Sequence, residues 1–297
     1  SAILLHVNPD CIKSLSFSQV ALLGNDREFE DFTLSLISLV GLQQLHLIDC
    51  CLLNDLGVLP LDTILNGIST YGALPNLNHI ELYAVDIDRE PVGSFLSPGA
   101  LANLVRYKAS LTKLNLEDLT LTDAHIVELA RAMETNRTLM ILKLWGCAVL
   151  DRGMTAIAGM LERNKWLLQL DLSYNEIGDD GCTAVAKSLY VNNTLKSLKL
   201  VRNESISNGS KGYRALLEMM KWNHVLEELL LQPLPESDSD LGFYLFVNRH
   251  RYLLENENIT RVQLVDTLHS HNNDITFLYH FLKAKPSLCD IEVRKPA

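Results

Sequence analysis

The 297-residue sequence has no apolar run of the roughly 18 to 20 residues that a membrane-spanning helix needs. Its start, Ser1 to Val7, lacks the basic region of a signal peptide. Only six cysteines occur, and none forms a C-x-x-C pair, which is too sparse for a disulfide scaffold. We therefore expect a soluble protein of a reducing compartment, the cytoplasm, without contact to a membrane.

Basic residues are also scarce relative to acidic ones. Lys and Arg number 26 against 36 Asp and Glu, which gives a net charge of −10 and makes nucleic acid an unfavourable partner. The motifs G-x-x-x-x-G-K-[ST], G-x-G-x-x-G, H-E-x-x-H and G-x-S-x-G are all missing. The sequence thus predicts no catalytic residues, no cofactor and no enzymatic activity.

What the sequence does contain is a repeat. The template L-x-x-L-x-L recurs along almost the whole chain, with intervals that cluster on 28 residues and lengthen where loops are inserted. The clearest copy runs from Leu167 to Ile177. The template predicts ten units in all, which begin at Ile12, Leu42, Leu77, Leu111, Leu139, Leu167, Leu195, Leu226, Ile259 and Leu288.

Within each unit the apolar period changes from 2 to 3.6, which predicts a strand followed by an amphipathic helix. Alanines at a fixed offset, Ala130, Ala158 and Ala186, would let helix and sheet approach closely. The predicted buried helix faces are Ile126, Leu129, Met133; Met154, Ile157, Leu161; Cys182, Val185, Leu189; and Tyr213, Leu216, Met220.

Two sets of polar residues share this register. Asp123, Asp151 and Asp179 stand where a helix N-cap is needed. Asparagines stand three residues before successive strands, a position that suits a left-handed residue ending a helix, and we assign them a structural role. They are Asn136, Asn164, Asn192, Asn223 and Asn256.

A 28-residue period with a true helix in each unit resembles the ribonuclease-inhibitor type of leucine-rich repeat, shared by ribonuclease inhibitor, the Ran GTPase-activating protein, the tropomodulin C-terminal domain and NOD-like receptors. The resemblance covers residues 12 to 294. It implies one α/β solenoid domain over 1–297, a horseshoe of about ten repeats with a parallel concave sheet and convex helices. At the motif's Asn position the chain has Cys50, Val85, Leu119, Cys147, Asn175, Asn203 and Leu234, of which Val85, Leu119 and Leu234 break the pattern.

Alternate strand residues of such a solenoid point away from the core, and they form our candidate binding surface. Trp145 is the strongest candidate, because hot spots concentrate in Trp, Tyr and Arg. The alternative is that Trp145 covers its own loop by packing on Cys147 or Tyr174. Acidic side chains, including Asp118, would favour a basic partner segment. The predicted partner-binding residues are Trp145, Tyr174, Lys143, Tyr83, Glu81, Glu117, Asp171, Lys199, Arg202 and His46.

Histidines offer the few candidates for chemistry. His46 and Glu81 occupy the same position in adjacent units, with His79 diagonal to them. We interpret them as an ion pair or a partner contact rather than a metal site, because no third ligand is positioned. His269 and His271, with Asp266 nearby, fall in a predicted loop, and we assign them no metal either. Cys50 and Cys51 are interpreted as structural.

Two loops depart from the repeat: the insertion at residues 204–212, and the acidic segment 233–240, where Ser237 and Ser239 suit acidophilic kinases. Both ends lack complete caps, so we expect a longer chain or an assembly that covers them. The sequence predicts a non-enzymatic scaffold or sensor module that binds protein partners on its concave face. The alternatives are a GTPase-activating accessory resembling the Ran activator, and an actin or ciliary structural adaptor.

Overall fold

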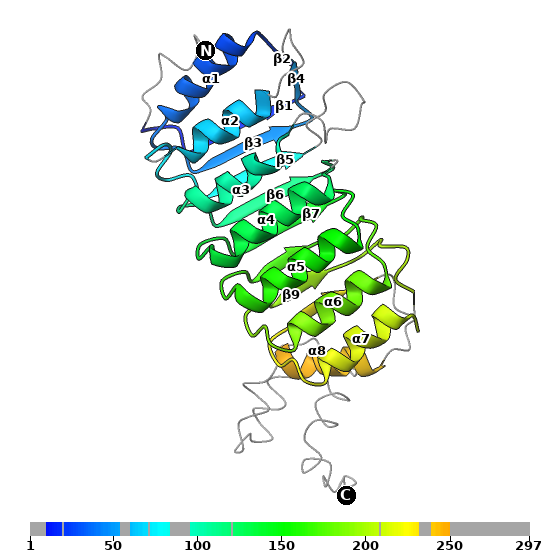
Figure 1. The fold of residues 1–297 in the computed structure, drawn as a ribbon. Helices are drawn as coiled ribbons and strands as arrows, with labels where there is room; N and C mark the ends of the chain where they lie inside the picture. The colour runs from blue at the N-terminus through cyan, green and yellow to red at the C-terminus, as the bar shows by residue number, and fades with distance from the viewer. Residues whose placement is uncertain are drawn as a thin grey trace, which may run out of the picture.

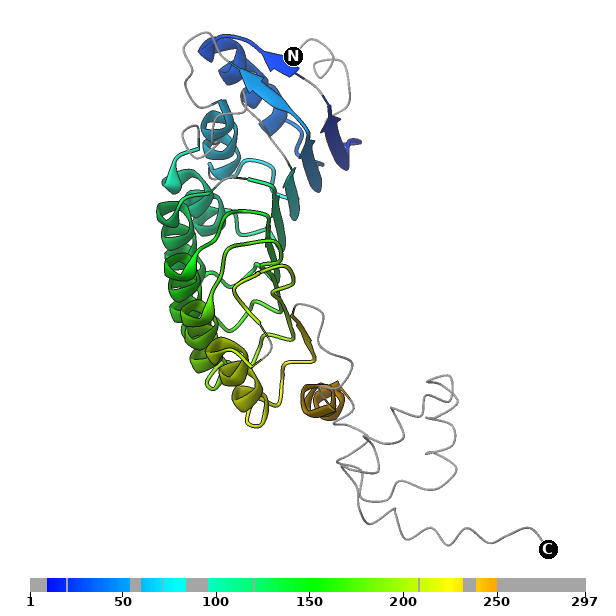
Figure 2. The same cartoon turned by 90° about the vertical axis from the view of Figure 1, so that its right-hand side faces the viewer.

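The chain folds into a curved arc of two layers, one of strands and one of helices (Figures 1 and 2). No helix within the described ranges is long and apolar enough to cross a membrane. The computed structural model describes residues 10–19, 21–53, 60–70, 72–83, 96–119, 121–207, 209–231 and 239–249.

Among the described residues, eight parallel strands form the main sheet, and their order in the sheet is their order in the chain. Each strand begins two residues after a predicted repeat start, which confirms the leucine-rich repeat solenoid. The repeats predicted at Ile259 and Leu288, and the single-domain boundary 1–297, lie partly or wholly outside the described residues. The strands are β1 (Ser14–Ser18), β3 (Gln44–Ile48), β5 (His79–Tyr83), β6 (Lys113–Glu117), β7 (Ile141–Trp145), β8 (Gln169–Asp171), β9 (Ser197–Lys199) and β10 (Glu228–Leu230).

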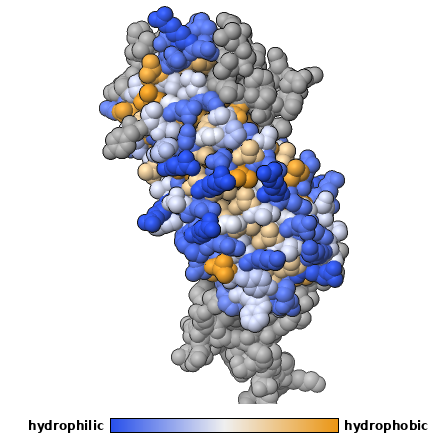
Figure 3. All heavy atoms as spheres, viewed as in Figure 1, coloured by the Kyte–Doolittle hydropathy of each residue, from blue (hydrophilic) through white to orange (hydrophobic). Residues whose placement is uncertain are grey.

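Helices follow the strands and cover the convex face of the sheet. This face is mostly hydrophilic toward solvent, with small apolar spots scattered over the described residues (Figure 3). Two short strands, β2 (Ala21–Leu23) and β4 (Cys51–Leu53), pair in a second sheet, so Cys51 begins a strand rather than lying in a turn. The helices are α1 (Asp26–Ile37), α2 (Pro60–Ser69), α3 (Pro98–Tyr107), α4 (Asp123–Thr135), α5 (Asp151–Arg163), α6 (Asp179–Leu189), α7 (Lys211–Met220) and α8 (Ser239–Arg249).

The core lies between the two layers and consists of the residues that the repeat predicts. Leu142 and Leu144 of β7 are at most 1% exposed, and every predicted helix-face residue from Ile126 to Met220 is buried. Ala130 and Ala158 are also buried. Because each fully buried leucine contributes roughly 2 kcal/mol relative to an exposed one, the stacked leucines are the main stabilising term.

The asparagines before the strands are structural where the structure describes them, but none of these is left-handed as predicted. Asn256 lies outside the described residues. Asn164 has φ −70° and ψ 132°, an extended conformation. Its Nδ2 donates to Met133 O at 2.7 Å in the preceding repeat, and its Oδ1 accepts from Trp166 N and Leu167 N. The side chain itself satisfies the turn's backbone groups, so no left-handed residue is needed.

The predicted aspartate N-caps are off by one residue. The caps are Thr122, Leu150 and Gly178, and each aspartate is the first helical residue instead. Asp151 Oδ1 accepts from Gly178 N at 2.7 Å and Gly181 N at 2.9 Å, at the start of α6. The carboxylate therefore caps the helix of the following repeat rather than its own, a contact that one repeat taken alone does not reveal.

Asp179 makes the same kind of contact with α7, and this predicts a pH effect. Its carboxylate accepts from Ser210 Oγ, Gly212 N and Lys211 N, which lowers its pKa below the ordinary 3.8. A lowered folded-state pKa gives stability that is present above the unfolded-state value and lost as pH falls through the folded-state value. In Asp179→Asn, we expect the free energy of unfolding to fall less between about pH 7 and about pH 3 than in wild type.

Urea titration at both pH values measures this difference. Asp180→Asn is the matched control, because the Asp180 side chain is 80% exposed and pairs only at the surface with Lys211. Equal acid sensitivity in wild type and Asp179→Asn would contradict the assignment.

The last described helix, α8, leaves the row formed by α1 to α7 and lies beneath the last strand of the sheet (Figure 2). Asn248 Nδ2 donates to Asn223 O and Leu226 O, and Leu241 is buried. The predicted acidic loop 233–240 is thus too long, because Ser239 is already the first residue of α8. Ser237 lies outside the described residues.

Candidate protein-binding surface

The strand register aligns eight of the ten predicted partner-binding residues in two rows across the concave sheet, while Tyr174 and Arg202 lie in turns. Neighbouring strands place their corresponding residues side by side, so the residues that face outward from each strand form rows across the sheet. The first row is His46, Glu81, Asn115, Lys143, Asp171 and Lys199, and the second contains Ile48, Tyr83, Glu117 and Trp145.

Trp145 and Tyr174 form an aromatic pair at the end of β7 and in the turn after β8. Their ring centroids are 4.5 Å apart, with the planes tilted by 42°. Tyr174 is 49% exposed, and Trp145 is partly exposed. Trp145 therefore packs on Tyr174, in agreement with the alternative that it covers its own loop. The pair still exposes aromatic surface to solvent. Contact with a partner stays a prediction.

The turns after β1, β3, β6, β7, β8 and β9 each use a left-handed residue at the same repeat position, and after β1 this residue is Gln19, with φ 54°. The position is filled by Asp49, Asp118 and Gly146, which tolerate positive φ. In the next two repeats it is filled by Tyr174 and Arg202, both with φ 59°. A left-handed conformation at a bulky residue costs roughly 1 kcal/mol, and it recurs here because the repeat turn requires it.

Arg202→Gly should relieve this strain. We expect its free energy of unfolding to rise by about 0.5 to 1 kcal/mol, while any partner contact of the guanidinium is lost. Gly146→Ala at the equivalent position should change stability in the opposite direction, because φ is +65° and a Cβ would collide with Asp118 Oδ1. Equilibrium urea unfolding of both variants tests the pair, and a destabilised Arg202→Gly would show that the arginine supports the fold instead.

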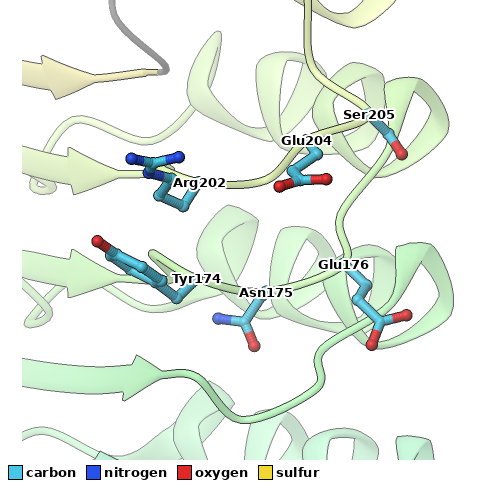
Figure 4. A pocket seen from close by; sticks show the side chains of 6 residues that line it. All are labelled: Tyr174, Asn175, Glu176, Arg202, Glu204 and Ser205. Atoms are coloured by element: carbon cyan, nitrogen blue, oxygen red, sulfur yellow. The ribbon is translucent and has the colours of Figure 1, made fainter.

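An open pocket of about 560 Å³ adjoins the aromatic pair. In Figure 4, Tyr174 and Arg202 lie side by side at the strand ends, and acidic side chains stand in the loops beyond them. The predicted partner-binding residues did not include the other four residues that line the pocket. Two of these four belong to the insertion at residues 204–212. These four are Asn175, Glu176, Glu204 and Ser205.

The predicted acidic stripe is partly neutralised within the protein. Glu81 Oε2 lies 2.6 Å from His46 Nδ1, and Glu117 Oε1 lies 3.4 Å from Lys143 Nζ. In register, Asp171 stands between Lys143 and Lys199, so charges alternate along the first row. A uniformly acidic face is therefore not what these strands present.

Negative charge does accumulate around Tyr83. The Asp118 carboxylate, followed by desolvation and Asp49, raises the pKa of the Tyr83 hydroxyl. Desolvation raises the pKa of Asp118, and Asp49 adds to that effect, while a hydrogen bond with Tyr83 opposes it. This acidic corner, made of Asp49, Asp118 and Tyr83, is the part of the surface that favours a cationic group of a partner.

Two further predictions concern cysteines at the motif's Asn position. Cys50 and Cys147 are buried, and the Cys147 Sγ donates to Leu116 O at 3.2 Å. Burial raises the pKa of the Cys147 thiol to about 12. Both cysteines are therefore structural, and Leu119 at the same position is simply buried in the core. Val85 and Leu234 lie outside the described residues.

Repeating strands, buried leucines and helices of this kind define a leucine-rich repeat protein. The model of the TMOD/LMOD leucine-rich domain family matches residues 98–233 of this chain. No curated protein matches the sequence.

Many solved structures are similar to the chain, and two of them are of the tropomodulin and leiomodin kind. One is titled Leiomodin-1 Actin-Binding Site 2, with 25% identity and a TM-score of 0.47, covering 52% of this chain and 89% of the other. The second is a tropomodulin C-terminal domain from Caenorhabditis elegans, with 15% identity and a TM-score of 0.48, covering 54% of this chain and 97% of the other.

Proposed function

We propose that the chain is a non-enzymatic protein-recognition module that binds its partner through the Trp145 and Tyr174 pair and the charged residues beside it. The observation that supports this proposal most is a partly exposed aromatic pair, held on a rigid sheet between the acidic corner and Arg202. A preformed surface loses little conformational entropy on binding, so a few aromatic anchors suffice for affinity. The predicted basic segment of the partner would approach the acidic corner.

The partner we propose is actin. Support comes from the match of residues 98–233 to the TMOD/LMOD leucine-rich domain model, because a leiomodin-1 structure is titled as an actin-binding site. The matched stretch 98–233 contains the aromatic pair, Arg202 and the pocket between them. This support favours the actin adaptor over the GTPase activator among the alternatives that the sequence leaves open.

Binding of the full chain to both forms of actin tests the proposal. Cosedimentation measures binding to filaments, and sedimentation velocity with labelled monomer measures binding to monomeric actin. We expect a saturable complex with at least one form. If neither form binds, actin is eliminated as the partner, and affinity purification from cell extract then identifies which protein depends on Trp145.

We also propose a cytoplasmic location. The described cysteines Cys11, Cys50, Cys147 and Cys182 are free thiols, as expected in a reducing compartment. Labelling of the thiols in protein taken from cells, with and without prior reduction, would test this location. Disulfide formation by Cys11 inside cells would argue against it.

A further inference from the structure

His46, His79 and Glu81 bring three possible metal ligands together on the concave sheet. One donor atom from each of the three side chains lies within 4.8 Å of the other two. The register explains the cluster: His46 on β3 stands directly beside Glu81 on β5, and His79 precedes Glu81 by two residues, so it shares the same face. The two imidazole rings meet edge to face, with centroids 4.9 Å apart.

The sequence alone positioned no third ligand, and in the structure His79 fills this place. His46 Nδ1 and Glu81 Oε2 already pair at 2.6 Å, but His79 Nε2 is buried and has no hydrogen-bond partner among the described residues. Leaving a buried polar nitrogen unpaired costs roughly 1 to 3 kcal/mol. A metal ion between the three side chains would remove this cost.

We propose that His46, His79 and Glu81 bind a divalent transition-metal ion, for which Zn²⁺ is the best fit. Two imidazoles and one carboxylate suit zinc, whereas calcium and magnesium take oxygen ligands. Lys113, beside His79 on β6, adds a positive charge that opposes purely electrostatic attraction of a cation. The selectivity of this site for zinc would therefore come from coordination by the imidazole nitrogens rather than from net negative charge.

The geometry needs only a small adjustment. Zinc–ligand distances of about 2.0 to 2.2 Å in a tetrahedron place donor atoms roughly 3.3 Å apart. Rotation of the side chains would bring the donors from at most 4.8 Å to that separation. The His46 and Glu81 side chains are 15% and 25% exposed, so the fourth position remains open to water from the concave side.

A supporting residue stands beside the ligands. Asn115 lies opposite Glu81 in the register, is 2% exposed, and its side chain contributes to the lowered pKa of Glu81 through a hydrogen bond. Partners of this kind orient metal-binding carboxylates. Desolvation raises the pKa of the Glu81 carboxyl, but His46, then His79 and Asn115, lower it by more, so the pKa lies below its usual value.

The test is titration of the full chain with Zn²⁺ alone, in competition with a chromophoric chelator, and with Co²⁺ as a spectroscopic probe. We expect one ion per chain and an intense visible spectrum typical of tetrahedral Co²⁺. His46→Gln, His79→Gln and Glu81→Gln should each weaken binding by about 100-fold or more. The variants should keep wild-type circular dichroism, which shows that each one folds before its affinity is compared.

Two controls locate the ion. His224→Gln changes an exposed histidine in the turn after α7 and should leave the affinity unchanged. The double variant His269→Gln and His271→Gln, at positions outside the described residues, should also leave it unchanged. Absence of binding, or undiminished affinity in folded His79→Gln, would overturn the proposed site. Neither result bears on actin binding, which is measured without added metal.

Discussion

Asn175→Ala is expected to lower the free energy of unfolding by about 3 kcal/mol. Asn175 is buried, and its Oδ1 accepts from Cys147 N at 3.0 Å and Val149 N at 2.9 Å. Its Nδ2 donates to Leu144 O at 2.7 Å and Leu172 O at 2.9 Å. Alanine would leave the two buried N–H donors and the carbonyls of two repeats without this partner.

Asn175→Cys is the matched control, because cysteine occupies the same position naturally. Cys147 Sγ donates to Leu116 O and Trp145 O, much as the asparagine amide does in its own repeat. Asn175→Cys keeps a donor and should therefore lose less stability than Asn175→Ala. Equilibrium urea unfolding gives both values, and equal losses would show that volume rather than hydrogen bonding sets the effect.

Trp145→Ala is expected to weaken binding of the partner by at least about 10-fold, and more if the indole is a hot spot. The substitution removes the larger ring of the aromatic pair and also the surface on which Tyr174 packs. Tyr174 would then lose its fixed orientation, which adds an entropic cost to binding. Titration of actin with both proteins, followed by cosedimentation or calorimetry, measures the change in Kd.

Two variants make this result specific. Trp222 is 66% exposed in the turn after α7, away from the strand ends, so Trp222→Ala should bind like wild type. Trp145→Phe keeps a ring on Tyr174 and should show an intermediate affinity. If Trp145→Ala and Trp222→Ala bind equally well, the aromatic pair covers its own loop and the binding surface lies elsewhere.

The sequence predicts the fold well because the dominant interaction repeats. Each leucine of the 28-residue pattern meets its counterpart in the next repeat, so one register predicts Leu142, Leu170 and Leu198 as neighbouring core residues. The aspartates and asparagines were predicted less well. Asp151 and Asn164 contact an adjacent repeat, and the repeat pattern gives their position without showing which helix or turn they serve.

The candidate surface was predicted in the same uneven way. Alternation along each strand predicts that Glu117 and Trp145 face outward, and the register places them side by side. The pocket was not predicted, because it depends on how the inserted loop carries Glu204 toward Arg202. Nor does sequence pattern reveal that His79 Nε2 lacks a partner, which depends on the rotation of individual side chains.

The carboxylate links between repeats have a mechanical consequence. Asp151 links α5 to the start of α6, and Asp179 links α6 to the start of α7. A stretching force along the arc would act on these hydrogen-bonded links in series, and the weakest link would break first. Because each repeat contacts only its neighbours, rupture there would divide the arc into two segments that each keep their own stack.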